Sequence, residues 1–349
     1  MSQSYPSSSS RFSSHQEPTS PARQARSASS STRSTSTNQH TSDDASHRIS
    51  SSKPTRSASR GRTSQRSSLW LPKQHGAWGM LLIPPVIGMI LGGWTWAYIP
   101  TFIAWWMGYL SFWAWGVWAR TRSPRRKALA FIPLAAYSSF TVFVGLITLI
   151  SIPTLLTWAP VFLPLITIAG WQQWRGRERS LLSGVSTTLA ASAMTAVFYS
   201  ISLRHNASAW SLASPWGFLH PSASTTANNA ESLHGWAWVW LVTALVTAYF
   251  VGTVPYVKSM IRGRGDRPLM VGSSIFHVLV ACAVWIAAGM SWVSWWCAVV
   301  FTVVALRAVA LPLMQAVRLR DHRPVIRPRM IGFSEVALSL LVLLVLVSG

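Results

Sequence analysis

Three short polar strings hold the side chains of this chain that could do chemistry, and each stands beside an apolar segment. They are Pro72-Lys73-Gln74-His75-Gly76-Ala77-Trp78, the run from Gln172 to Arg179, and the run from Tyr256 to Arg262. Arg presents a planar fork that grips phosphate or carboxylate at two points, whereas Lys acts as a point charge and His can donate, accept or titrate. Several such groups on one membrane face would form an anion site.

The candidate ligand-binding residues are therefore those of the three strings: Lys73, Gln74, His75, Arg175, Arg177, Glu178, Tyr256, Lys258 and Arg262. Each string also has a structural interpretation. The first could be an interfacial anchor with Trp78 in the aromatic belt, and the basic residues of the other two could simply orient the chain. A lone acid among arginines, Glu178, favours an internal ion pair that holds the guanidinium groups in position.

Two charged residues fall inside apolar segments, Arg307 in Ala305-Leu306-Arg307-Ala308-Val309 and Glu335 six residues after Arg329. A charge inside a membrane span costs at least about 2.5 kcal/mol and usually marks a partner or a site. If the span of Arg307 ends near Pro312, both charges lie at a comparable depth, which predicts a mutual ion pair. The rival interpretation is that Glu335 faces the cluster of His75 and Arg177. His277, also in a span, is more typical of a satisfied interior histidine than of a catalyst.

The sequence contains no motif for several other common kinds of site. No run resembles a phosphate-binding glycine loop, a nucleophile elbow or a zinc pattern. The few acidic residues after position 68 are scattered, which argues against an acidic metal cluster. The sequence therefore predicts no metal site, and it identifies neither a cofactor nor a catalytic residue.

The elements that must position these residues are membrane spans. We expect an all-α bundle of nine helices of about 20 residues each, the length that crosses a bilayer. The expected spans are 76–97, 99–119, 128–150, 153–171, 181–203, 235–257, 270–290, 292–313 and 330–348.

The basic residues then fix the orientation. After position 68, all Lys and Arg except Arg204 and Arg307 lie in five patches, which occupy the same end of alternate spans. They are Lys73, Arg120 to Lys127, Arg175 to Arg179, Lys258 to Arg267, and Arg318 to Arg329. Because an excess of Lys and Arg marks the cytoplasmic side, the sequence predicts a multi-pass protein of the cell membrane with its N-terminus in the cytoplasm.

Composition favours the same class. Half of the residues are hydrophobic, 11% are charged, and 21 of the 349 are Trp, a residue enriched at bilayer interfaces. The net charge of +22 is distributed over short loops and the N-terminal region, which favours membrane lipids over nucleic acid as partners. Residues 1–68, rich in Ser, Thr and Arg, read as a disordered cytoplasmic tail, and residues 69–349 as the membrane domain.

The string from Lys73 to Trp78 resembles the YwiC-like family of bacterial membrane proteins. The resemblance continues in order through Trp174 to Leu181, through Gly252-Thr253 and Tyr256 to Arg262, and ends at Arg329-Met330-Ile331-Gly332. It covers about residues 70–349 and leaves out the tail. The family consists chiefly of uncharacterised integral membrane proteins, so the resemblance implies a membrane fold and no particular activity.

A second likeness is to UbiA-type prenyltransferases, which also have nine spans, an inside N-terminus and active-site loops after the second and sixth spans. The corresponding loops here are 120–127 and 258–268. Those enzymes hold Mg²⁺ and a prenyl diphosphate with Asp-rich motifs, whereas the first loop here has no acid and the second has only Asp266. The metal-dependent mechanism therefore does not carry over. Either arginines replace the metal on a shared scaffold, or the activity is lost.

The leading hypothesis is that basic cytoplasmic loops bind an anionic lipid or isoprenoid-type ligand at the inner leaflet, with or without catalysis. His75, Arg177, Lys258 and Arg262 would be the main contacts. The alternative is a transporter or a non-catalytic accessory membrane subunit. Transporters of polar solutes usually show buried polar groups near the midplane, whereas here most polar residues gather at one face.

The orientation can be tested with reporter fusions. Fusions after residues 125, 177, 262 and 322 should report cytoplasm, and a fusion within 206–230 should report the outside, because basic loops stay on the cytoplasmic side. An external signal from any of the first four would contradict the topology.

Overall fold

The computed structural model of the chain describes residues 70–72, 75–206, 235–261 and 263–348. All of the described residues belong to one compact unit of the chain. The predicted tail, the proposed boundary at 68/69 and the long connection around 207–234 lie outside the described residues.

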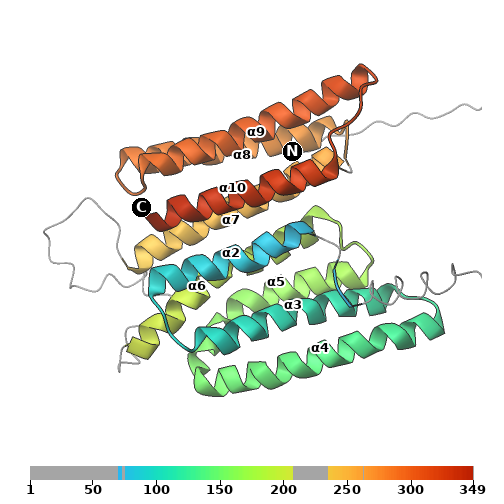
Figure 1. Cartoon of the computed structure of the whole chain (residues 1–349), viewed down its shortest axis with the longest axis vertical. Helices are drawn as coiled ribbons and strands as arrows, with labels where there is room; N and C mark the ends of the chain where they lie inside the picture. The colour runs from blue at the N-terminus through green and yellow to red at the C-terminus, as the bar shows by residue number, and fades with distance from the viewer. Residues whose placement is uncertain (1–69, 73–74, 207–234, 262, 349) are drawn as a thin grey trace, which may run out of the picture. The chain divides into compact units, whose positions relative to one another are not determined.

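The prediction of an all-α protein is confirmed, because every regular element among the described residues is helical (Figure 1). The elements are α2 (His75–Gly92), α3 (Tyr98–Arg120), α4 (Pro124–Ser151), the 3-10 helix η1 (Pro153–Trp158), α5 (Ala159–Trp174), α6 (Leu181–Asn206), α7 (Trp236–Ile261), α8 (Arg267–Gly289), α9 (Trp295–Arg320) and α10 (Pro328–Ser348). In chain order these elements match the nine expected spans, with η1 and α5 together forming the fourth.

Seven of these elements are long and apolar enough to cross a membrane: α4, η1 with α5, α6, α7, α8, α9 and α10. The chain is therefore a multi-pass membrane protein by helix length and composition. The apolar part of α2, Trp78–Gly92, is shorter than a usual span. Helix α3 has 23 residues but is not among the seven. Membrane crossings by α2 and α3, and the orientation of the bundle, stay predictions.

At the basic end of the bundle, several helices extend beyond the apolar segments that the sequence predicts as spans. Helix α9 continues through Pro312 to Arg320, beyond the expected end of the eighth span at residue 313. Helix α7 likewise continues to Ile261 and α4 begins at Pro124, one residue after Ser123. The backbone hydrogen bonds of a helix form within the helix itself, so it can continue from the hydrocarbon into the polar interface. There the Lys and Arg side chains place their charged groups in water.

Local signals set several helix boundaries. Proline occupies the first turn of α4, α5 and α8, where no backbone N–H is required. Asp266 caps α8 by accepting a hydrogen bond from the Leu269 N–H at 3.3 Å, and Ser294 caps α9 through Trp296. Gly93, with φ +78°, follows the end of α2 in the left-handed conformation that glycine tolerates best.

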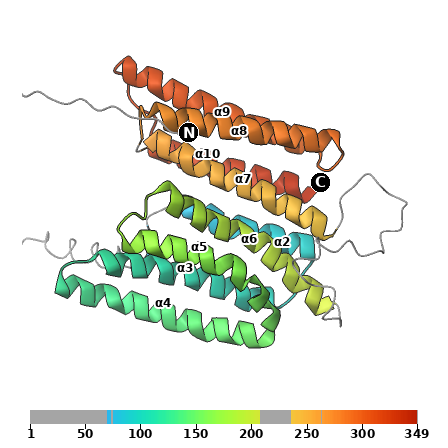
Figure 2. The ribbon, with the colours of Figure 1, turned by 180° about the vertical axis from the view of Figure 1, so that it is seen from behind.

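Helix α6 is the most buried of the seven candidate spans, and it packs against α2, α5 and α7 (Figure 2). Its buried face is made mainly of small residues: Ser183, Ser186, Thr188, Ala190, Ala191, Ser192, Thr195, Ala196, Ser200 and Ser202. Large apolar side chains are instead exposed on α4, α8, α9 and α10. This distribution suits hydrocarbon surroundings, in which helices associate through close backbone approach and not through apolar burial from water.

The remaining helices pair mainly with their neighbours in the chain, and α10 also packs on the distant α2. Helix α3 packs on α4, α8 on α9, and α10 on both α9 and α2. Helix α7 contacts α6 on one side and α8 on the other, so it joins the group α2–α6 to the group α8–α10.

The closest approach of α2 and α6 depends on Gly88 and Gly92, which are spaced as Gly-x-x-x-Gly. A Cβ atom on Gly88 would overlap the backbone carbonyl of Thr195 and stand 2.8 Å from Cβ of Phe198. We expect Gly88→Ala to lower the free energy of unfolding by about 1 to 3 kcal/mol, the usual cost of overpacking, because the backbone of α6 must move. Thermal unfolding in detergent measures the loss.

Gly145→Ala in α4 is the matched control, because nothing lies within 4 Å of its added Cβ. That change should be neutral or slightly stabilising, since alanine favours a helix over glycine. Equal stabilities of the two variants would show that the α2–α6 contact is not close-packed.

Candidate functional site

The four basic connections of the described chain lie at one end of the helices, on the right in Figure 1. They join α3 to α4, α5 to α6, α7 to α8 and α9 to α10. Antiparallel packing of successive helices brings alternate connections to the same end. The basic patches therefore gather as the sequence predicts, and their assignment to the cytoplasmic side stays a prediction.

Glu178 joins two of these connections. It forms an ion pair with Arg120 at the end of α3 and a longer one with the neighbouring Arg179, whose Nε is 3.5 Å from its Oε1. The internal pair expected from a lone acid among arginines is thus present, but its main partner comes from another loop. Sequence reasoning did not select Arg120, because nothing in the sequence says that the end of α3 meets the α5–α6 connection.

The pairing leaves other cations of the predicted site exposed. Arg177 is exposed, and Arg175 is exposed with its guanidinium carbon 4.6 Å from the centre of the Trp171 ring. Lys258 is half-buried in the last turn of α7. Lys73, Gln74 and Arg262 lie outside the described residues, and His75 is the first residue of α2. The described part of the site is thus a group of cations that face the surface.

Tyr256 is separated from these cations. It is fully buried among α7, α8 and α9, and the Arg307 guanidinium carbon lies 4.2 Å above its ring. The structure therefore places Tyr256 with the intramembrane charges and not with Lys258, although the two are only two residues apart. Helical geometry gives the reason, since residues separated by two positions point to different faces.

Arg307 and Glu335 form an ion pair between α9 and α10, through Nη1 and Oε1. Their side chains are only 7% and 13% exposed. Counted from the end of α9 and the start of α10 the two residues are not equally distant, because α9 extends beyond Pro312. Their comparable depth in the membrane stays a prediction. Glu335 also accepts, through its backbone carbonyl, hydrogen bonds from Tyr249 at 3.3 Å and from Ser339 at 2.7 Å.

His277 of α8 completes this interior group. Its Nδ1 lies 2.7 Å from the carbonyl oxygen of Ser273, and its ring centre is 6.4 Å from that of Tyr256. A Cβ on Gly252 of α7 would stand 2.8 Å from His277 Nε2, so that glycine allows the imidazole to approach α7. We name Tyr249, Tyr256, Ser273, His277, Arg307, Glu335 and Ser339 the interior polar cluster.

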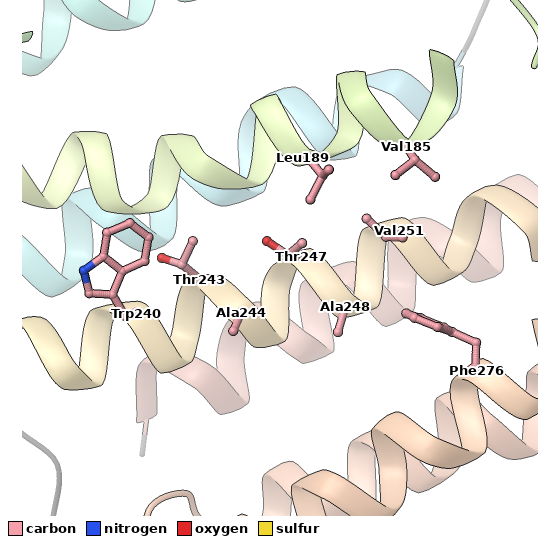
Figure 3. Close-up of a pocket in the computed structure, with 9 residues that line it drawn as sticks. All are labelled: Val185, Leu189, Trp240, Thr243, Ala244, Thr247, Ala248, Val251 and Phe276. Atoms are coloured by element: carbon pink, nitrogen blue, oxygen red, sulfur yellow. The ribbon is translucent and has the colours of Figure 1, made fainter. Parts of the chain in front are cut away.

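An apolar groove runs along α7 beside this cluster (Figure 3). It has a volume of about 420 Å³, and its walls come from α6, α7 and α8. The lining residues are Val185, Leu189, Trp240, Thr243, Ala244, Thr247, Ala248, Val251 and Phe276. Sequence reasoning missed the groove. The available signal was the set of small side chains at helical spacing on α7, at positions 243, 244, 247 and 248.

No group of three or more His, Cys, Asp or Glu side chains comes together within the described ranges. What the site offers is therefore exposed cations at the helix ends, an apolar groove, and a neutralised charge pair in the interior.

This combination defines a class, a multi-pass helical membrane protein with a polar interior. The sequence pattern of the YwiC-like protein family matches residues 71–199, which run from the segment before α2 into α6. The chain is also 32% identical over 213 residues to "Uncharacterized protein YwiC" of Bacillus subtilis (strain 168), an alignment that covers 60% of this chain and 74% of that protein. The chain therefore belongs to the YwiC-like family.

No solved structure matches the chain significantly. The likeness to UbiA-type prenyltransferases stays a prediction.

Because Arg307 and Glu335 form an ion pair in the interior, we expect the effects of substituting them on the free energy of unfolding to be strongly non-additive. Arg307→Leu or Glu335→Leu alone should each lower the free energy of unfolding by about 3 to 5 kcal/mol, because the remaining charge is left buried without a partner. The double variant should recover most of this loss, since two apolar side chains need no partner. A double-mutant cycle on detergent-solubilised protein measures the coupling, and additive losses would show that the pair contributes no stability.

Proposed function

We propose that this protein binds an anionic lipid or an isoprenoid-type ligand from the leaflet that meets its basic end. The apolar chain of the ligand would lie in the groove along α7, and its phosphate or other anionic headgroup would meet the cations of the basic loops. The observation that carries the proposal is the groove itself, because an exposed, almost entirely apolar groove within the spans fits a hydrocarbon chain.

The dimensions of the groove support a chain-like ligand. The lining residues of α7 extend from Trp240 to Val251, which corresponds to about 16 Å at 1.5 Å per residue, roughly half of a bilayer's hydrocarbon core. On α7 the lining side chains from Thr243 to Val251 are short and Trp240 stands at one end, while Leu189 of α6 and Phe276 of α8 face the groove from the other helices (Figure 3). A chain lying in this groove would contact three helices at once.

The groove leads toward Lys258. Its lining residues on α7 follow one helical face, and Lys258 stands seven residues beyond Val251 on the same face. Seven residues are about two turns, or roughly 10 Å, and the flexible stem of Lys spans part of that distance. A headgroup at the end of the groove would thus lie near the ammonium group of Lys258.

Another cation, Arg177, lies at the same basic end of the helices and supports the same placement of the headgroup. The exposed Arg177 belongs to the connection that leads into α6, the helix that forms the opposite wall. The ion pair between Glu178 and Arg120 holds this connection near α3. Glu178 also pairs with Arg179, whereas Arg177 forms no ion pair with an acidic side chain among the described residues. We assign the headgroup contacts to Arg177 and Lys258, with His75 and Arg262 as the further predicted contacts.

The alternative class, a transporter or a non-catalytic accessory membrane subunit, draws its support from the interior polar cluster. Transporters commonly carry buried polar groups inside the bundle. The sequence suggested that most polar residues gather at one face, whereas Arg307, Glu335 and His277 gather in the interior among α7 to α10. The lipid-binding proposal and this alternative therefore rest on different parts of the molecule.

Filling the groove tests the lipid-binding proposal. Ala244→Phe should reduce the lipid retained after gentle purification by roughly tenfold. That loss corresponds to about 1.4 kcal/mol, the value of about two buried methylene groups. Mass spectrometry of lipids bound to the purified protein measures the change. Ala136→Phe on the exposed face of α4 adds the same ring outside the groove and should leave the retained lipid unchanged.

The headgroup is tested by charge removal at the end of the groove. Lys258→Gln with Arg177→Gln should release an acidic or diphosphate lipid, whereas Lys127→Gln, which removes a cation that lies 4.4 Å from the Trp118 ring, should not. An identical set of lipids in all of these variants would remove the proposal.

A further inference from the structure

The interior polar cluster contains buried polar atoms that no described protein group satisfies. They are Oη of Tyr256, Oγ of Ser273, Nε2 of His277, Nε and Nη2 of Arg307, and Oε2 of Glu335. They come from four consecutive helices, α7 to α10. A buried donor or acceptor without a hydrogen-bond partner costs free energy. Inside a bilayer the surrounding hydrocarbon contains no water that could supply the missing hydrogen bond. Such a concentration in one place points to a site and not to a packing fault.

The orphaned atoms divide into donors and acceptors. The Ser273 carbonyl oxygen can only accept, so Nδ1 of His277 donates to it and the neutral ring leaves Nε2 as a bare acceptor. Glu335 uses Oε1 in its ion pair, which leaves Oε2 as the second acceptor. Around them stand N–H and O–H groups from Arg307, Tyr256 and Ser273. The two acceptors are the places where a proton can bind.

Arg307 connects the two acceptors. Its Nη1 contacts the Glu335 carboxylate, and its charge lies within electrostatic range of the His277 ring. Its guanidinium also stacks on the Tyr256 ring at 4.2 Å, a contact between a cation and an aromatic face that does not depend on Glu335. When the carboxylate is neutralised, Arg307 therefore keeps a stabilising neighbour.

We propose that the interior polar cluster is a proton-binding site within the membrane domain. The groups that take up the proton are Glu335 and His277. On uptake, an O–H bond of a hydronium ion breaks and leaves water, and the proton forms an O–H bond at Oε2 of Glu335 or an N–H bond at Nε2 of His277. No covalent bond between heavy atoms breaks, and the charge of the cluster rises by one.

The titratable groups around these two residues come from the four helices α7 to α10. Helix α2 also packs against α10 and places Gly79 next to Ser339, and the only titratable residue in α2 is its first one, His75. Helix α7 contributes Tyr249 and Tyr256, α8 contributes His277, α9 contributes Arg307, and α10 contributes Glu335. Only one of these side chains carries a fixed positive charge and only one is a carboxylate. A protonatable His and a carboxylate inside a bundle are typical of membrane proteins that bind or relay protons.

This proposal goes beyond lipid binding and does not rest on it. The groove and the cluster lie on different faces of α7, with Gly252 and Phe276 next to both. Phe276 lines the groove, while its neighbour His277 faces the cluster. A protein that retains no lipid could therefore still take up the proton.

Infrared difference spectroscopy of the full-length protein in lipid bilayers tests the site. Spectra recorded at about pH 5 and at about pH 8, the range over which histidine usually titrates, should differ by a protonated-carboxyl band and by imidazole bands. The carboxyl band should disappear in Glu335→Gln. It should persist at a changed position in Glu335→Asp, which keeps a carboxyl group. The imidazole bands should weaken in His277→Gln.

Two matched variants serve as controls. Glu178→Gln removes a carboxylate that is ion-paired at the helix ends, and His322→Gln removes an exposed histidine. Neither should change the bands assigned to the cluster. Elution volume and helical content of each variant report folding, and Glu335→Asp keeps the test informative if Glu335→Gln does not fold. Difference spectra that are the same in wild type, the folded Glu335 variants and His277→Gln would overturn the proposal.

Discussion

Close approach of helix backbones through small side chains is the constraint on which the rest of this fold depends. In hydrocarbon, apolar side chains gain little by leaving lipid for protein, so helices associate where backbones can come close. Helix α6 satisfies this condition on several sides at once, with Ser, Thr and Ala buried against α2, α5 and α7. Gly88 and Gly92 provide the complementary surface on α2. Helix α7 then joins α6 to the group α8–α10, so its two faces decide what the interior contains.

The described charges fall into two groups that differ in their exposure and in the free-energy cost of leaving a charge unpaired. Those at the helix ends are exposed or half-buried, and pairs such as Arg120 and Glu178 are of the kind that contributes little stability in water. The charges of Arg307 and Glu335 are enclosed by helices, where an unpaired charge would be costly. The first group can meet a ligand or a lipid surface without rearrangement. The second can change its state only by exchanging protons or polar ligands inside the bundle.

The two proposed sites share helix α7, and α8 contributes Phe276 to the groove and His277 to the cluster. Small side chains at Ala244, Thr247 and Ala248 leave the groove open on one face, whereas Tyr249 and Tyr256 reach into the interior from another. Gly252 lies between the two, and its missing side chain gives His277 its position. One helix can thus support an apolar surface for a lipid chain and a polar interior, because helical periodicity separates side chains only a few residues apart.

The sequence by itself determined the class, the number and order of the helices within the described ranges, and the gathering of basic residues at one end. These follow from apolar length and from charge alternation, which are local properties of the chain. It also predicted the contact between Arg307 and Glu335, from the expectation that both charges lie at a comparable depth. Only the tertiary structure decided which residues meet: Arg120 with Glu178, Tyr256 with Arg307, and His277 with Gly252. It also decided where α6, α7 and α8 leave a groove. Such contacts depend on the rotation of each helix about its axis and on which helices become neighbours, and both are set by packing across the whole bundle.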